Sequence, residues 1–288
     1  MGFKIMRISI LGNDSTHTYL FAKLILSNPY IEGIRIQLNS IWGDNETNNS
    51  KLEKEFGKEL IKRNIDDALY DIDFALVLGR FSDSHFQHAY YAIRKGVGVF
   101  VDKPVFENIN DAEKIIELAT KNNVFFCGGS ALRFCDLVIK HKKDKSLNNS
   151  YLVIGPSRCI DMGEDRRFDN VNFYGYHVIE ILLELIGNDI ISSDFYFNNG
   201  DFFVNIKSQN GEGRITLLDN INEKYILGKK INSHLRISEI LLDGSYNFNL
   251  LKNLVKAYKN KKPLIEHKST LNAINFLNKM NELKYKIL

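Results

Sequence analysis

Residues 73–104 read DFALVLGRFSDSHFQHAYYAIRKGVGVFVDKP, a segment in which two apolar runs enclose a more polar stretch. Residues 73–78 and 97–101 are short and apolar, as expected for buried strands, whereas residues 84–95 have the spacing of a helix. Strands without a polar face, separated by helices, are typical of a parallel sheet that helices cover on both sides. The segment therefore predicts one strand-helix-strand unit of a doubly wound α/β domain.

The same alternation extends from the start of the chain to about residue 127. We expect further strands at residues 8–11, 34–41 and 124–127, and helices at residues 18–27, 51–56 and 110–122.

After about residue 150 the pattern changes. A helix over residues 174–185 precedes a run of strand candidates from residue 190 to 242, and helices follow at 248–259 and 270–284. Asn199-Gly200 and Asn210-Gly211 are strong hairpin signals, so this half of the chain is expected to hold a mostly antiparallel sheet. Two domains are therefore favoured over one.

The composition is that of an ordinary globular protein. The chain has 288 residues, 44% of them hydrophobic and 25% charged, which suits one large or two ordinary domains. Lysine and arginine number 38 against 35 acidic residues, a balance that argues against nucleic acid or an anionic membrane surface as a partner. The low proline and high asparagine content fits either extensive loops or a coding bias, and composition alone leaves both open.

Cysteine use and the apolar runs bear on location. Cys127, Cys135 and Cys159 have no C-x-x-C spacing and cannot all pair with one another, which favours free thiols in a reducing cytoplasm. No apolar run reaches the roughly 18 residues of a membrane span, and the first residues lack the features of a secretory signal. We expect a cytoplasmic protein that does not enter a membrane.

The turn after the first strand, Gly12-Asn13-Asp14-Ser15-Thr16-His17, stands where a doubly wound domain binds the pyrophosphate of a dinucleotide. It keeps only the first glycine of G-x-G-x-x-G, so the motif is weak evidence by itself and an ordinary capped turn is the alternative. Ser15, Thr16 and His17 could donate hydrogen bonds to phosphate oxygens. Asp14 could either repel phosphate or cap the helix with its carboxylate turned aside.

Further candidates follow the later strands. Asp44 comes after the second strand, where an acidic residue commonly accepts hydrogen bonds from ribose hydroxyls and favours NAD over NADP, although chance also places acidic residues in loops. His85 and Asp102-Lys103-Pro104 are expected at the carboxyl edge of the sheet, where ligands bind. Lys103 could hydrogen-bond a substrate hydroxyl or carbonyl oxygen, or it could be a solvated loop lysine.

Residues from Asp73 to Arg133 resemble the Gfo/Idh/MocA family, the relatives of glucose-fructose oxidoreductase and inositol dehydrogenase. In that family a His-x-x-x-Ala helix start leads through Gly-x-x-Val to a Glu-Lys-Pro motif, at the separation that His85 and Lys103 have here. The resemblance continues in residues 173–180, FYGYHVIE, and in Lys262-Pro263-Leu264. It implies a Rossmann domain over residues 1–127 and an α/β domain over residues 128–288, whose open, mostly antiparallel sheet often forms a dimer interface.

The resemblance also implies roles for individual residues. Lys103 matches a lysine that binds the reacting oxygen and assists proton transfer, His177 matches a proposed acid/base, and Tyr174 could add a hydroxyl group. The candidates for cofactor binding are Gly12, Asp14, Ser15, Thr16, His17, Asp44, Arg80, His85, Asp102, Lys103 and Pro104. The candidates for substrate binding are Lys103, Arg133, Tyr174 and His177. No metal is expected, because His85 and His88 lack carboxylate ligands at helical spacing.

The sequence departs from the family pattern in several places. Phe173 stands where many members have an aspartate four residues before the histidine, and Asp102 replaces the usual glutamate. The first turn also lacks two of the three glycines. Charged residues at Arg158, Asp161 and Arg166-Arg167 fit either an anionic substrate or interdomain salt bridges.

The resemblance implies an oxidoreductase that uses NAD or NADP and moves hydride between nicotinamide and a carbon bearing a hydroxyl, ketone or imine group. The substrate would be a sugar-like molecule or a biosynthetic intermediate, with Lys103 and His177 handling the proton. One alternative is a dinucleotide-binding sensor or scaffold with a degenerate site, and another is a lyase or hydrolase that uses NAD transiently. We expect a homodimer or tetramer formed through the C-terminal sheet.

Overall fold

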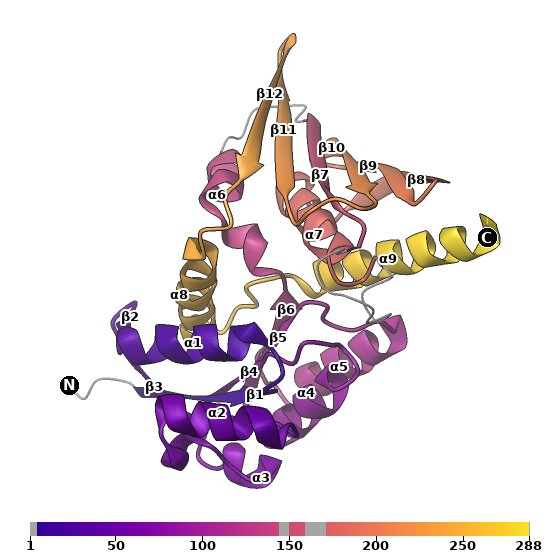
Figure 1. Cartoon of the computed structure of the whole chain (residues 1–288). Coiled ribbons are helices and arrows are strands. Elements are labelled where there is room, and N and C mark those ends of the chain that lie inside the picture. Colours follow the sequence, from indigo (N-terminus) through magenta and orange to yellow (C-terminus); the bar gives the residue numbers. More distant parts are fainter. Residues whose placement is uncertain (1–4, 144–149, 159–170, 288) are drawn as a thin grey trace. The chain divides into compact units, whose positions relative to one another are not determined.

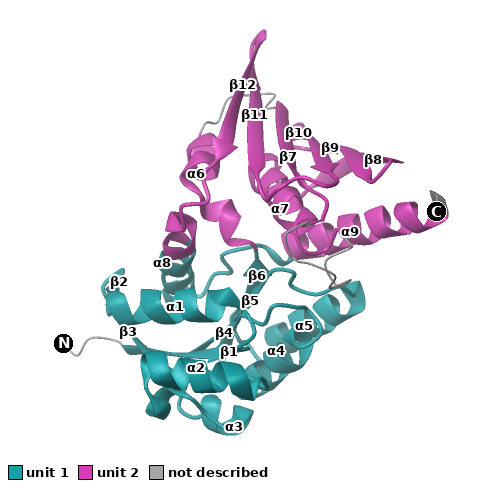
Figure 2. Cartoon of the chain, viewed as in Figure 1, with its two compact units in different colours: residues 1–129, 250–267 teal, residues 130–249, 268–288 magenta. Residues whose placement is uncertain are grey.

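The computed structural model describes residues 5–143, 150–158 and 171–287 and divides into two compact units (Figures 1 and 2). Unit 1 comprises residues 1–129 and 250–267, and unit 2 comprises residues 130–249 and 268–288. Each unit contains one six-stranded sheet. Among the described residues, no helix is long and apolar enough to cross a membrane.

Unit 1 is built on a sheet with the strand order β2-β3-β1-β4-β5-β6. The strands are β1 (Ile5–Leu11), β2 (Tyr30–Ile31), β3 (Ile34–Trp42), β4 (Phe74–Val77), β5 (Gly98–Asp102) and β6 (Phe126–Gly129). All neighbours pair in parallel except the short edge strand β2. The order reverses direction at β1, which makes the carboxyl end of β1 the topological switch point where such sheets bind ligands.

Helices connect these strands, and asparagine caps several of them. The helices are α1 (Thr16–Ser27), α2 (Glu46–Phe56), α3 (Ile65–Ala68), α4 (His85–Arg94) and α5 (Ile109–Lys121), with a 3₁₀ turn at Lys58–Leu60. The side chains of Asn45, Asn64 and Asn108 accept hydrogen bonds from backbone N–H groups of the helices that they precede. Because Asn45 caps α2, that helix begins five residues before the predicted start at Lys51.

Unit 2 contains a second sheet, with the order β12-β11-β7-β10-β9-β8. Its strands are β7 (Ser150–Pro156), β8 (Ile190–Asn198), β9 (Asp201–Ser208), β10 (Gly211–Leu218), β11 (Tyr225–Ile231) and β12 (His234–Ile240). Only β7 and β10 pair in parallel, so the prediction of a mostly antiparallel sheet is confirmed. The predicted hairpin at Asn199-Gly200 joins β8 to β9, and both residues have positive φ, 49° and 94°.

Helix α7 (Gly175–Ile186) packs on one face of this sheet. A Cβ atom on Gly155 of β7 would lie 2.5 Å from Val178, and one on Gly213 of β10 would lie 2.3 Å from Leu182. These two glycines therefore let the backbones of the strands approach the helix. A 3₁₀ turn (Ala131–Phe134), α6 (Asp136–Lys143) and α9 (His267–Ile287) complete the unit.

The chain passes between the units within α8 (Ser245–Lys259), so neither unit is one continuous segment (Figure 2). The predicted boundary after residue 127 lies two residues before the observed division. The prediction also assigned both C-terminal helices to the second domain, whereas residues 250–267 belong to unit 1. Aromatic packing accounts for this difference, because the Tyr258 ring contacts those of Phe74 and Phe125 with centroid distances of 5.3 and 5.9 Å.

Candidate active site

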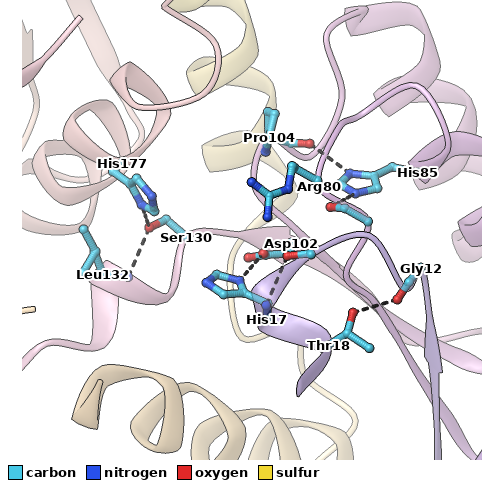
Figure 3. Close-up of polar contacts among 12 residues, drawn as sticks. Gly12, His17, Thr18, Arg80, His85, Asp102, Pro104, Ser130, Leu132 and His177 are labelled. Carbon is cyan, nitrogen blue, oxygen red and sulfur yellow. Dashed lines mark hydrogen bonds and ion pairs between the residues drawn. The ribbon is translucent and has the colours of Figure 1, made fainter. Parts of the chain in front are cut away.

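The first turn of unit 1 packs closely against the turn that follows β4. Gly12 has a φ of +99°, and a Cβ atom there would lie 2.5 Å from the backbone nitrogen of Gly79. The Thr18 hydroxyl donates to the Gly12 carbonyl oxygen over 2.7 Å (Figure 3). Only glycine satisfies both the positive φ and the close approach, so the one glycine that the motif retains is structurally required.

Asn13 joins this turn to the loop after β3. Its buried side-chain amide donates to the Asn45 carbonyl oxygen and to Asn49 Oδ1, both over 2.8 Å. The side chain also lies 2.4 Å from where a Cβ atom on Gly43 would stand. Sequence reasoning missed this role. The loop that carries the exposed Asp44 is therefore fixed to the first turn.

Ser15, and not Asp14, caps helix α1. The Ser15 hydroxyl accepts from the His17 N–H over 3.1 Å, and Thr16 is the exposed first residue of the helix. The Asp14 carboxylate instead accepts from the backbone N–H of Arg80 over 3.0 Å, while Arg80 Nε donates to the Asp14 carbonyl oxygen. The prediction that Asp14 caps the helix is therefore wrong. Its carboxylate is nevertheless turned aside, because it accepts from a backbone N–H group.

His17 and Asp102 form an ion pair across the carboxyl edge of the sheet. His17 Nδ1 lies 2.5 Å from Asp102 Oδ2, and Asp102 is 2% exposed. Burial raises the pKa of the Asp102 carboxyl, but the charge and hydrogen bond of His17 outweigh burial, with a smaller contribution from Lys103, and the pKa is lowered. Asp102 therefore stays ionised and accepts a hydrogen bond from the imidazole ring.

His85 is a structural residue of the same edge. Its fully buried ring places Nδ1 2.9 Å from the Pro104 carbonyl oxygen and Nε2 2.8 Å from the Gly79 carbonyl oxygen. Both nitrogens are thus engaged by the backbone. The prediction that the His85 side chain binds the cofactor is corrected, because the ring instead ties the turn after β4 to the Lys103-Pro104 segment.

Lys103 and Pro104 follow β5 directly and are both buried. The peptide bond between them is cis. Lys103 is 7% exposed, which rules out the alternative of a solvated loop lysine. Its backbone position next to Asp102 places it at the carboxyl edge, as the sequence predicts.

In unit 2, His177 is paired with a serine. Ser130 Oγ lies 2.5 Å from His177 Nδ1, and the Ser130 hydroxyl also accepts from the Leu132 N–H over 3.1 Å (Figure 3). The His177 ring is 6% exposed and packs edge-on against Tyr225, with the centroids 5.5 Å apart. A hydroxyl group therefore occupies the place beside the histidine ring that a carboxylate would take in an Asp-His pair. Tyr174 immediately precedes α7 and is buried.

Arg133 is a structural residue of unit 2. Its guanidinium, 2% exposed, donates to Glu180 over 3.0 Å, to Glu184 over 2.6 Å and to the Ser269 hydroxyl over 2.5 Å. Burial lowers the pKa of Arg133, but the two carboxylates raise it above the ordinary arginine value. The prediction that Arg133 binds substrate is therefore corrected, because both terminal nitrogens of its guanidinium donate to partners within the unit.

Part of the charged cluster predicted around Arg158 falls outside the described residues, namely Asp161 and Arg166-Arg167. Arg158 itself is paired with Asp219 in unit 2. This salt bridge lies within unit 2, so it is not one of the interdomain salt bridges that the sequence left open.

Comparison with known proteins identifies unit 1. Residues 11–129 match the Gfo/Idh/MocA family model, described as an oxidoreductase family with an NAD-binding Rossmann fold. Residues 11–129 are therefore similar to the NAD-binding Rossmann domain of the Gfo/Idh/MocA oxidoreductases. No curated protein sequence matches the chain.

Solved structures of dehydrogenases share the fold over nearly the whole length. Myo-inositol 2-dehydrogenase from Lactobacillus plantarum is 14% identical, with a TM-score of 0.79 and 97% of each chain covered. Scyllo-inositol dehydrogenase from Lactobacillus casei is 15% identical, with a TM-score of 0.79 and coverage of 98% of this chain and 97% of that chain. The dehydrogenase MviM from Clostridium difficile is 16% identical, with a TM-score of 0.73 and coverage of 96% and 99%. At this identity the likeness shows the fold.

The Gfo/Idh/MocA match confirms the predictions of a Rossmann domain and of NAD or NADP as the cofactor class. The first turn fits a dinucleotide although it has only one of the three glycines. Gly12 keeps the tight turn, Ser15 orders the start of α1, and the Asp14 carboxylate is held by a backbone N–H group. The buried Asp102 Oδ1 has no hydrogen-bond partner among the described residues and could accept from a ligand hydroxyl.

Proposed function

We propose that the chain is an NAD(P)-dependent oxidoreductase acting on a hydroxyl, ketone or imine carbon of a small molecule. The observation that carries the proposal is the placement of Lys103 beside Asp102 at the carboxyl edge of a Gfo/Idh/MocA Rossmann sheet. When bound, the nicotinamide supplies or accepts the hydride. The protein's residues then bind the substrate, orient it and move a proton.

Lys103 is proposed to bind the reacting oxygen. Its side chain is held in a buried setting, where an ammonium group can donate to an alkoxide or carbonyl oxygen without competition from bulk water. Asp102 is the neighbouring anion that offsets the charge of the ammonium group. Lys103 Nζ would stabilise negative charge on the substrate oxygen and deliver or accept its proton.

His177 is proposed as the second proton-transfer group, and Tyr174 as a hydroxyl donor in the same unit. The Ser130 hydroxyl can donate to Nδ1 of a neutral ring and can accept from Nδ1 of a protonated ring. It therefore supports both protonation states that an acid/base must visit. Since Phe173 stands in place of an aspartate, no carboxylate in that position favours the charged form.

We further propose that NAD is preferred over NADP. Asp44 follows β3 on a loop that Asn13 fixes to the first turn, and its carboxylate is exposed. A carboxylate there would accept from ribose hydroxyls and repel a 2′-phosphate group. The names of the solved dehydrogenases of inositols favour a polyol or sugar-like substrate.

A second candidate function is a dinucleotide-binding sensor or scaffold. This candidate is favoured because Nδ1 of His177 contacts a hydroxyl group, whereas a carboxylate at that nitrogen activates the imidazole in an Asp-His pair. A lyase or hydrolase that uses NAD transiently would share the same residues. Net formation of NADH during turnover separates an oxidoreductase from that enzyme class.

The proposed assembly is a homodimer or tetramer formed through the sheet of unit 2. On the face opposite the buried rows of this sheet, the exposed apolar side chains are those of Tyr196, Phe203, Leu235 and Ile237. Sedimentation equilibrium would give the oligomeric state. A cytoplasmic location is also proposed, supported by the buried thiols of Cys127 and Cys135, which form no disulfide bond among the described residues.

The test of the function combines binding and turnover. Titration calorimetry with NADH and NADPH measures both affinities, and a panel of polyols, sugars, hydroxy acids, ketones and imines is assayed by absorbance of the reduced cofactor. We expect tighter binding of NADH and turnover of at least one polyol or sugar-like compound. Tight binding without turnover of any compound would favour the sensor, and no binding of either dinucleotide would contradict the proposal.

A further inference from the structure

His17 and Asp102 are joined although 85 positions separate them in the sequence. His17 lies in the first turn of α1, after β1, and Asp102 ends β5 (Figure 3). In the sheet, β4 lies between β1 and β5. The pair therefore crosses the carboxyl edge beside the switch point, where a Rossmann domain binds its dinucleotide.

His17 stands at a position of the turn where the dinucleotide-binding motif has a glycine. If Gly12 is the first glycine of G-x-G-x-x-G, the second and third glycines correspond to Asp14 and His17. Glycine at the third position serves close packing between helix and sheet. Here that position carries an aromatic ring that reaches to β5 and, when protonated, adds a positive charge at the helix start.

Each partner has one polar atom left for a ligand. The His17 side chain is 23% exposed, and its Nε2 has no hydrogen-bond partner among the described residues. Asp102 Oδ1 is buried and likewise has no hydrogen-bond partner within the described residues. An unsatisfied carboxylate oxygen costs free energy, so the pair is incomplete without a donor at Oδ1.

His85, which lies at the same edge of the sheet, has no ring nitrogen left to bind a ligand. Both nitrogens of the buried His85 ring are engaged by backbone carbonyl oxygens. In the imidazolium form of His17, by contrast, the Nδ1–H group donates to Asp102 and the Nε2–H group remains available to an anion. The contact with the Asp102 carboxylate fixes the orientation of the ring.

We propose that His17 and Asp102 act as one dinucleotide-binding element, in which the His17 imidazolium binds the pyrophosphate. Glycines at positions 14 and 17 would allow the backbone to approach the pyrophosphate closely. Here the charged ring of His17 binds the pyrophosphate instead. Asp102 is the positioning residue of the element, because its Oδ2 contacts the His17 Nδ1 and orients the ring. The inference rests on the proposed function, because it presupposes that unit 1 binds a dinucleotide.

The test uses the full chain and measures the dissociation constants of ADP-ribose, which contains the pyrophosphate, and of AMP, which does not. Both are obtained by displacement of NADH, followed by its fluorescence. The variants are His17→Gln, Asp102→Asn and the double variant, with His234→Gln as a control at an exposed histidine of unit 2. Circular dichroism confirms that each variant is folded.

We expect His17→Gln to weaken ADP-ribose by about tenfold to a hundredfold, the usual effect of one charge-assisted hydrogen bond. AMP binding and the control variant should remain within about twofold of the wild type, the range of ordinary surface changes. Asp102→Asn should weaken ADP-ribose as well, and the double variant should bind no more weakly than His17→Gln, because the two residues act as a unit.

Three results would overturn the inference. ADP-ribose binding by His17→Gln at the wild-type level would show that the ring does not bind the pyrophosphate. Equal losses for AMP and ADP-ribose would mean that the pair only supports the fold. Losses that multiply in the double variant would mean that the residues act separately. If the wild type binds ADP-ribose but has no turnover, the proposed oxidoreductase function fails while this inference stands.

Discussion

Ser130 and His177 are hydrogen-bonded in unit 2, with 2.5 Å between the Ser130 Oγ and the His177 Nδ1. The serine also starts the 3₁₀ turn at Ala131–Phe134, because its hydroxyl accepts from the Leu132 N–H. One small side chain therefore orients a candidate catalytic ring and caps a turn.

Replacement of Ser130 should affect stability through both contacts. We expect Ser130→Ala to lower the free energy of unfolding by about 1–3 kcal/mol, because a buried ring nitrogen and a backbone N–H lose their partner. Ser130→Thr keeps the hydroxyl and is the matched control. Urea denaturation measures both variants, and an alanine variant as stable as the wild type would contradict the geometry.

Replacement of Lys103 should affect turnover more than folding. We expect Lys103→Met, which keeps most of the side-chain volume, to lower kcat by about 100-fold to 10,000-fold, the usual effect of removing a positioned acid/base. Steady-state kinetics with a substrate found in the panel gives this value. Turnover near the wild-type rate in a folded variant would reject the assigned role.

Arg133 should prove essential to the stability of unit 2. Arg133→Leu leaves the fully buried Glu180 without its ionic partner, and we expect a loss of about 3–5 kcal/mol in the free energy of unfolding. The double variant Arg133→Leu with Glu180→Leu should recover part of that loss, because no buried charge then lacks a partner. Urea denaturation of the three proteins tests this. A double variant less stable than Arg133→Leu would show that the carboxylate has a further role.

His88 makes stability depend on pH. Burial and, to a lesser extent, the nearby His85 lower the pKa of His88 to about 4. Between that value and the ordinary pKa of about 6.5, the unfolded chain binds a proton that the folded chain does not, so stability falls as pH decreases through this window. The loss at pH 4 from this group alone is about 3 kcal/mol.

Denaturation at pH 7 and pH 5 measures this dependence, and His88→Phe should reduce it. Trp42, the only tryptophan, stacks edge-on against His88 with the centroids 5.1 Å apart, so its fluorescence follows the site directly. An unchanged pH dependence in the variant would show that other groups dominate.

The sequence predicts β4 and β5 well because both are buried on both faces and nearly all of their residues are apolar. Strand β7 was missed, since buried and half-buried residues alternate along most of Ser150–Pro156 and the apolar signal is weaker. Lys103 could be placed at the sheet edge because it directly follows a predictable strand. The partners of His17, His177 and Arg133 are 85, 47 and up to 136 positions away. Local patterns carry no information about such pairings.

The route of the chain through α8 has a consequence for synthesis on the ribosome. A nascent chain that has emerged only as far as Gly129 already contains every strand of the Rossmann sheet, but it lacks the Tyr258 ring that packs on Phe74 and Phe125. That ring emerges only after nearly all of the second sheet's unit has been translated. Unit 1 is thus the first to be translated, but it is completed late. The aromatic surface that Tyr258 covers stays exposed to the cell's chaperones until that residue has emerged.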